Sequence, residues 1–210
     1  MDSAPDIQSV AAAILGSLGK DALTLEETRS FIGDGSAVFV SRMMSARGIK
    51  ETHHRHAALY DEFVARCECA VQQTVCYPGV ADALTELHGA GHALGLCTNK
   101  PLGPTRAVIN HVGLEPLFGT VVAGDMLANR KPEPEMLLRA IDDLGGGATL
   151  YVGDSEIDSE TARRAGVPFA LYSDGYHKLA ADKMHHERVF DHFNELRPIV
   201  IAALRDSTQG

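Results

Sequence analysis

The chain has 210 residues and a mass of 22.5 kDa, with 45% hydrophobic and 22% charged residues, which is ordinary usage for a globular protein. This length suffices for one sizeable core and a small second unit. The formal net charge of -9 argues against a nucleic-acid partner, which favours a basic surface. No apolar stretch has membrane-spanning length, so we expect no membrane partner. The sequence does not distinguish a monomer from a homodimer.

Four cysteines, namely Cys67, Cys69, Cys76 and Cys97, lack the paired spacing of zinc sites. Reduced thiols in a cytoplasmic protein are the simplest interpretation, and we expect Cys97 to lie in a buried strand.

The first part of the chain is expected to be helical. Its apolar spacing predicts four helices before the Tyr77-Pro78-Gly79 segment. Between the second and third of them, the turn Gly33-Asp34-Gly35 is flanked by Arg29 and Arg42, which are equally plausible as ligands of a substrate carboxylate and as solvated charges. The predicted helices span residues 5–19, 25–31, 37–48 and 53–73.

After residue 79, apolar strands alternate with helices, which is typical of a parallel sheet covered on both faces. We therefore predict an α/β fold, with a doubly wound parallel sheet core and a small α-helical cap. The core comprises residues 1–6 and 77–210, and the cap comprises residues 7–76. The predicted strands lie at 92–97, 119–124 and 148–152, and the predicted helices at 79–90, 102–112, 133–144 and 156–165.

Polar side chains follow each predicted strand. Thr98 and Asn99 end the first strand, and Lys131 follows the second, held just outside a helix by the prolines of KPEPEML. Asp154 and Asp158 follow the third, which is expected to be fully buried. In open α/β folds, ligands bind at these strand ends, and carboxylates there suit magnesium. Simpler explanations remain for each residue: a turn threonine, a surface lysine, and acidic caps of a helix.

Together the segments CTNKP at 97–101, KPEPEML at 131–137 and GDSEID at 153–158 resemble the haloacid dehalogenase-like hydrolases, and within them the phosphoglycolate phosphatase type. The resemblance implies that Thr98 and Asn99 bind the transferring phosphoryl group and that Lys131 neutralises its charge. It also implies that Asp154 holds Mg²⁺, with Asp158 as a second acidic group in the metal site.

The same resemblance implies that the backbone N–H groups at Gly33 and Gly35 face the substrate, although a plain turn between helices explains this loop equally well. We thus expect a Mg²⁺-dependent phosphatase acting on a small phosphorylated substrate such as 2-phosphoglycolate, through an aspartyl-phosphate intermediate. Alternatives are a phosphomutase or dehalogenase of the same family, and a catalytically inactive protein that binds phosphate or has a regulatory role.

Family members open with an apolar strand ending in Asp-x-Asp-Gly-Thr, which supplies the nucleophile, and this motif is absent from the sequence. Asp2 and Asp6 are poor substitutes because no strand precedes them, and we expect Asp2 to lie in a mobile terminus. Absence of an interior strand would leave two neighbouring strands with unpaired edges. We therefore expect the reading frame to extend upstream by roughly 10 to 20 codons, encoding that motif after an apolar run of ~5 to 6 residues. Without it, the chain should be nearly inactive.

Overall fold

The computed structural model describes the backbone of residues 1–206 and the side chains of residues 1–204. Contacts divide the chain into two compact units. Unit 1 comprises Met1–Val75 and Asn99–Glu115, and unit 2 comprises Cys76–Thr98 and the described residues from Pro116 onward. The predicted division into core and cap stays a prediction. The contacts group residues 99–115 with the N-terminal helices.

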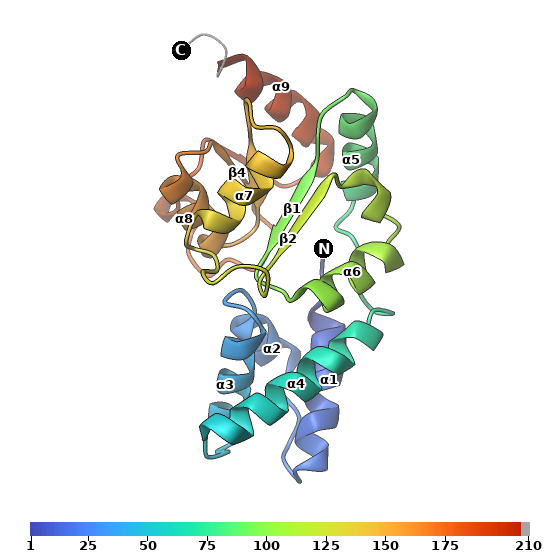
Figure 1. Cartoon of the computed structure of the whole chain (residues 1–210), viewed down its shortest axis with the longest axis vertical. Coiled ribbons are helices and arrows are strands. Elements are labelled where there is room, and N and C mark those ends of the chain that lie inside the picture. The colour runs from blue at the N-terminus through green and yellow to red at the C-terminus, as the bar shows by residue number, and fades with distance from the viewer. Residues whose placement is uncertain (207–210) are drawn as a thin grey trace. The chain divides into compact units, whose positions relative to one another are not determined.

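Unit 1 is helical, as its apolar spacing predicts (Figure 1). Its core contains Ile7, Ile14 and Leu15 from one face of the first helix, together with Phe39 and Phe63, whose rings stack 4.9 Å apart. Thr24 and Glu27 form a capping box that starts the second helix. The helices are α1 (Ala4–Ser17), α2 (Leu25–Phe31), α3 (Ser36–Ala46), α4 (His53–Cys69) and α6 (Leu102–His111).

The N-terminal residues of unit 1 are held in place, so the expectation of a mobile terminus is wrong. Asp2 forms an antiparallel bridge with Val75, and its carboxylate pairs with Arg29 at 2.9 Å and accepts from the backbone N–H of Ala4. Asp6 accepts the backbone N–H of Gln73 and the hydroxyl of Thr74. These contacts hold residues 73 and 74 outside a helix, which explains why α4 ends before the predicted residue 73.

Unit 2 has the predicted α/β architecture, and its paired strands are all parallel in the described residues. Among the described residues, two strands, one helix and three short 3₁₀ turns were not predicted. The strands are β1 (Gly95–Thr98), β2 (Thr120–Ala123), β3 (Tyr151–Gly153), β4 (Phe169–Tyr172) and β5 (Arg188–Phe190); the helices are α5 (Val80–Gly89), α7 (Glu135–Asp143), α8 (Glu156–Ala165) and α9 (Leu196–Asp206); the 3₁₀ turns are η1 (Glu115–Leu117), at the boundary of the units, η2 (Ala181–Lys183) and η3 (Phe193–Glu195).

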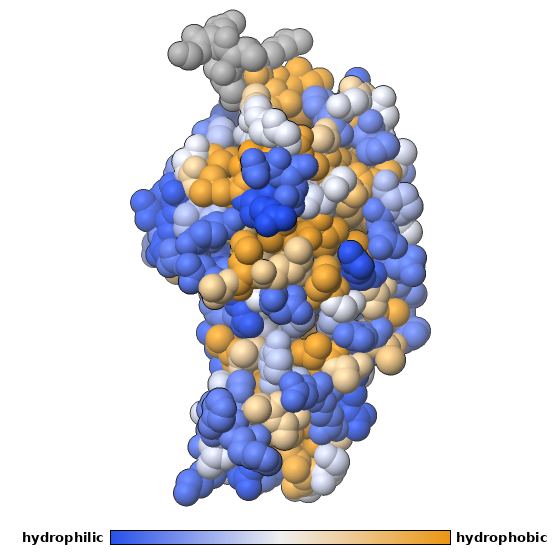
Figure 2. Space-filling view, viewed as in Figure 1, coloured by the Kyte–Doolittle hydropathy of each residue, from blue (hydrophilic) through white to orange (hydrophobic). Residues whose placement is uncertain are grey.

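The strands of unit 2 form two separate sheets in the described residues, in the orders β1-β2 and β3-β4-β5. Both β1 and β3 are therefore end strands, although their apolar sequences are typical of a sheet interior. Figure 2 shows hydrophobic residues at the surface over β1 and β2. The prediction of a fully buried third strand is wrong: β3 is partly exposed, whereas β4 is buried along its length. The split sheet agrees with the expectation that two strands would have open edges.

None of the helices in the described part of the chain combines the length and apolarity needed to cross a membrane.

Candidate active site

Lys131 lies in a cluster of polar groups from several elements of unit 2. Helix α7 begins at Glu135, and Pro134 is its N-cap residue. Lys131 therefore lies just outside the helix, as predicted. Its Nζ donates to the Cys97 carbonyl oxygen of β1 at 3.0 Å and to Asp158 Oδ1 at 2.6 Å. Only 9% of either charged side chain is exposed. Lys131 is therefore part of a buried ion pair and not a solvated surface charge.

Asp154 and Asp158 lie at the junction of β3 and α8. Ser155 is the N-cap of α8, where its hydroxyl oxygen accepts from the backbone N–H of Asp158 and its proton is donated to Asp158 Oδ2 at 2.6 Å. The backbone N–H of Asp154 lies 3.3 Å from that same carboxylate oxygen. Helix capping is thus part of the role of this segment, and it brings the two predicted metal ligands next to each other.

Two tyrosines that the sequence did not single out contact these carboxylates. The Tyr77 hydroxyl donates to Asp154 Oδ2 at 3.1 Å, and the Tyr151 hydroxyl donates to Asp158 Oδ1 at 2.8 Å. The sequence offered only a general signal for these contacts: the hydroxyl of a partly buried tyrosine usually has a hydrogen-bond partner, but the sequence does not say which. Tyr77 and Asp154 are far apart in sequence, so no spacing rule relates them.

The charges of the cluster determine the ionisation of its members. Burial would lower the pKa of Lys131, but attraction and hydrogen bonding to Asp158, together with the neighbouring Cys97 and Asp154, hold that pKa above its usual value. Burial would raise the pKa of Asp158, but attraction and hydrogen bonding to Lys131 hold it below its usual value. Burial, with the nearby charge of Asp158, raises the pKa of Asp154 and raises that of Tyr151 well above its usual range. The cluster therefore holds one firmly ionised pair beside a carboxylate whose charge is disfavoured.

Two glycines make room for the carboxylates. A Cβ atom at Gly153 would lie 2.4 Å from the Cβ of Asp158, and one at Gly175 would lie 2.2 Å from the Cβ of Asp154. Real Cβ atoms do not approach so closely, so only glycine lets these segments pack around the acidic pair. Gly175 follows β4, which the sequence did not predict.

Comparisons with known proteins give the family of this chain. A family model described as haloacid dehalogenase-like hydrolase matches residues 1–172. The chain belongs to that family. A phosphoglycolate phosphatase from Cereibacter sphaeroides (strain ATCC 17025 / ATH 2.4.3) is 40% identical over 195 residues, which cover 92% of this chain and 89% of the relative. A phosphoglycolate phosphatase from Rhodobacter capsulatus is 40% identical over 200 residues, which cover 95% and 91%.

The fold of this haloacid dehalogenase-like hydrolase is also that of solved structures. The crystal structure of a predicted phosphoglycolate phosphatase from Haemophilus somnus 129pt matches with a TM-score of 0.86 at 22% identity, covering 94% of this chain and 91% of that chain. The predicted family and fold class are therefore confirmed.

Thr98 is the last residue of β1 and directly follows Cys97, whose carbonyl oxygen contacts Lys131. The hydrolase thus has its predicted hydroxyl at a strand end, next to the backbone group that helps to hold the lysine.

The Gly33-Asp34-Gly35 turn lies in unit 1, where Asn99 contacts it. The Asn99 amide, which is 5% exposed, donates to the Gly33 carbonyl oxygen at 3.1 Å. Gly33 and Gly35 have φ of 125° and 90°, a backbone conformation that favours glycine. Arg42 pairs with Asp34 at 2.6 Å and donates to the Phe31 carbonyl oxygen. Arg42 therefore fixes the loop of this family member.

Arg29 is also engaged, since it pairs with Asp2. In this structure both arginines that could meet a substrate carboxylate serve contacts within unit 1.

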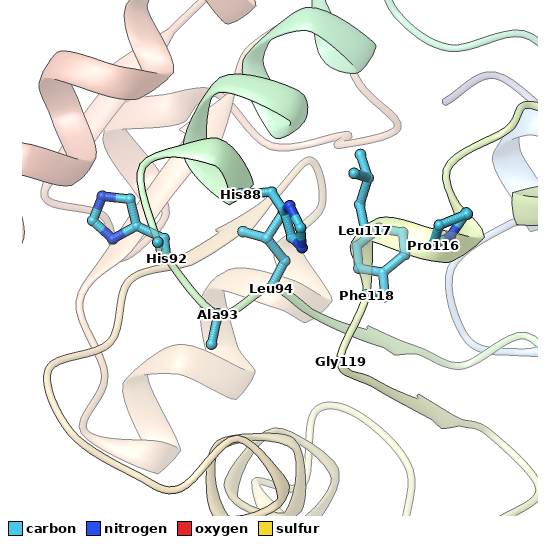
Figure 3. Close-up of a pocket in the computed structure, with 9 residues that line it drawn as sticks. His88, His92, Ala93, Leu94, Pro116, Leu117, Phe118 and Gly119 are labelled. Carbon is cyan, nitrogen blue, oxygen red and sulfur yellow. The ribbon is translucent and has the colours of Figure 1, made fainter.

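A cavity of about 290 Å³ in unit 2 is separate from these groups (Figure 3). It lies between segments that precede β1 and β2, at their amino ends, whereas Thr98 ends β1. The cavity is lined by His88, Gly91, His92, Ala93, Leu94, Pro116, Leu117, Phe118 and Gly119.

Within the described residues, no group of three or more His, Cys, Asp or Glu side chains could hold a metal ion.

Proposed function

We propose that this protein is a Mg²⁺-dependent phosphomonoester hydrolase of the phosphoglycolate phosphatase type. The observation that carries the proposal is the buried Lys131–Asp158 pair beside Asp154, in a chain that is 40% identical to phosphoglycolate phosphatases. Those relatives support a small phosphorylated substrate such as 2-phosphoglycolate. The free cysteines among the described residues support a cytoplasmic location.

In the proposed site, Lys131 stabilises the charge of the transferring phosphoryl group, because a fixed cation in a site of low dielectric stabilises an anion strongly. The Thr98 hydroxyl and Asn99 amide bind the phosphoryl oxygens. The backbone N–H groups at Gly33 and Gly35 face the rest of the substrate. Asn99 would combine this role with its hydrogen bond to the loop.

The acidic pair fits a magnesium ion. Mg²⁺ prefers carboxylate oxygens, and a divalent cation would offset the burial and repulsion that raise the pKa of Asp154. We propose that Asp154 is the ligand and that Asp158 supports the metal site while it holds Lys131. When bound, the ion would neutralise charge on the phosphoryl oxygens.

The sequence does not contain the Asp-x-Asp-Gly-Thr motif, which supplies the attacking carboxylate in this family. We propose that it comes from a further strand, ending in Asp-x-Asp-Gly-Thr, that pairs with the edges of β1 and β3. The support is that both are end strands with interior-type sequences. Without that strand, the 210-residue chain should be nearly inactive, since other site residues do not replace a missing nucleophile.

Hydrolysis of 2-phosphoglycolate with Mg²⁺ tests these statements. The chain alone should turn over slowly, and a synthetic peptide of ~5 to 6 apolar residues followed by Asp-x-Asp-Gly-Thr should raise the rate. The matched control is the same peptide with its first Asp replaced by Asn. Full activity of the chain alone, or equal stimulation by the control peptide, would contradict the proposed source of the nucleophile.

A second candidate is a catalytically inactive phosphate-binding or regulatory protein, which the absent motif favours. That candidate predicts binding of inorganic phosphate without turnover, whichever peptide is added. Loss of phosphate binding as well would contradict both candidates.

A further inference from the structure

The hydroxyl of Tyr151 lies between the two charged groups of the buried pair. It is 3.0 Å from Lys131 Nζ and 2.8 Å from Asp158 Oδ1. An ammonium group can only donate and an ionised carboxylate can only accept, so the direction of both bonds is determined. The phenol oxygen accepts a hydrogen bond from the Lys131 ammonium group, and the phenol O–H donates a hydrogen bond to Asp158.

The ring of Tyr151 is anchored independently of this polar contact. Its centroid lies 5.8 Å from that of Phe169, which is fully buried in β4, and it packs against a core cluster that includes Leu171. The position of the hydroxyl is therefore set by the hydrophobic packing of β3 and β4, which is rigid compared with a lysine side chain.

Around Lys131 Nζ, three acceptors come from three different elements. They are the Cys97 carbonyl oxygen of β1, Asp158 Oδ1 of α8 and the Tyr151 hydroxyl of β3. A lysine has a long side chain with several rotatable bonds, and its ammonium group needs fixed acceptors to hold one position. The Tyr151 hydroxyl contacts both members of the ion pair through one atom.

We propose that Tyr151 is a positioning residue, which fixes the ammonium group of Lys131 so that it meets the phosphoryl group of the substrate. The proposal rests on the proposed function, because it gives Lys131 an anionic ligand. Tyr151 does not touch the substrate. It acts through the lysine, by holding Nζ from one side while Asp158 and Cys97 hold it from the others.

Replacement by phenylalanine separates this role from packing, because Tyr151→Phe keeps the ring and removes the hydroxyl. Hydrogen bonds to charged groups are the stronger ones, so the affinity for inorganic phosphate should fall roughly tenfold. The affinity for Mg²⁺ should stay within about twofold, since Asp154 has its own partner in Tyr77. The matched control is Tyr60→Phe, which removes the same atom from α4 of unit 1 and should change neither affinity.

Calorimetric titration of the full chain with inorganic phosphate and, separately, with MgCl₂ gives both affinities, and thermal unfolding reports whether each variant is folded. A second comparison uses Lys131→Ala as the background, where adding Tyr151→Phe should weaken phosphate binding no further. Additive losses there would assign the effect to the hydroxyl and not to the lysine, and would overturn the proposal.

Other results are equally decisive. Unchanged phosphate affinity in Tyr151→Phe, a parallel loss of Mg²⁺ affinity, or an unfolded variant would each overturn the positioning role. Failure of the unmodified chain to bind phosphate at all would instead contradict the proposed function.

Discussion

Replacing Lys131 with alanine should destabilise the fold far more than removing a surface cation. Lys131 and Asp158 are 2.6 Å apart with 9% of each side chain exposed, so the variant leaves a buried carboxylate without its cation. Breaking such a pair typically costs about 3 to 5 kcal/mol. Ser155 and Tyr151 still donate to Asp158, which places the expected loss near the lower limit, at about 3 kcal/mol.

The loss should also depend on pH in a definite direction. In the native protein the pKa of Asp158 is held below its usual value of 3.8, so its stabilisation is present above that value and is lost as the pH falls through the lowered pKa. In Lys131→Ala, the cation that lowers the pKa of Asp158 is gone, so burial should raise this pKa above the value in the unfolded chain. Asp158 should then bind a proton more readily in the folded state than in the unfolded state. The difference between the two proteins should therefore be largest near pH 7 and shrink as the pH falls toward 4.

Urea unfolding followed by far-UV circular dichroism measures this difference, because the chain has no tryptophan to serve as a fluorescent reporter. Arg139→Ala is the control. It breaks a pair with Asp143 in which 54% of the arginine side chain is exposed, so solvent screening should leave little or no loss of stability. A loss in Lys131→Ala no greater than in the control, or one that is equal at pH 7 and pH 4, would refute the reasoning.

Further predictions concern the same site. Asp154→Asn should weaken Mg²⁺ binding in calorimetry by removing a charged oxygen, and equal affinity would exclude Asp154 as a ligand. In the unmodified chain, Mg²⁺ affinity should fall as the pH is lowered toward the raised pKa of Asp154, because protons then compete with the cation; a constant affinity would contradict this. Lys131→Ala should reduce phosphate affinity and Lys131→Arg should restore it only in part, so unchanged binding in the alanine variant would remove Lys131 from the site. Gly153→Ala should cost about 1 to 3 kcal/mol through the clash with Asp158, whereas Gly16→Ala has open space and should not destabilise.

The sequence predicted the order of strands and helices in unit 2 as far as α8, because apolar runs ending in polar residues mark the strands β1, β2 and β3. It did not predict β4 and β5 as strands. β4 lies in the apolar run at 167–172, which directly follows the Gly166 cap of α8, and β5 contains a single buried residue, Phe190. Such short segments carry little periodicity. The end of α4 was also placed too late, because Asp6, which is distant in sequence, sets it.

In the candidate site, the local sequence was sufficient to predict a contact when both of its residues lie in one segment. The approach of Asp158 to Ser155 follows from helix capping within four residues. The strand-end positions and the family resemblance both placed Lys131 and Asp158 at one site, but neither predicted the direct ion pair between them. The hydroxyls of Tyr77 and Tyr151 and the close approach of Gly175 depend on the packing of separate elements, which spacing rules do not describe.

The division of the sheet in unit 2 has a practical consequence for handling the protein. The outer edge of an apolar strand is a template on which strands of other molecules can add, and natural proteins normally protect such edges with charges, bulges or covering segments. The central residues of β1, Leu96 and Cys97, carry no charge and are partly exposed. Self-association should therefore increase with protein concentration, and light scattering should detect aggregates first in concentrated stocks.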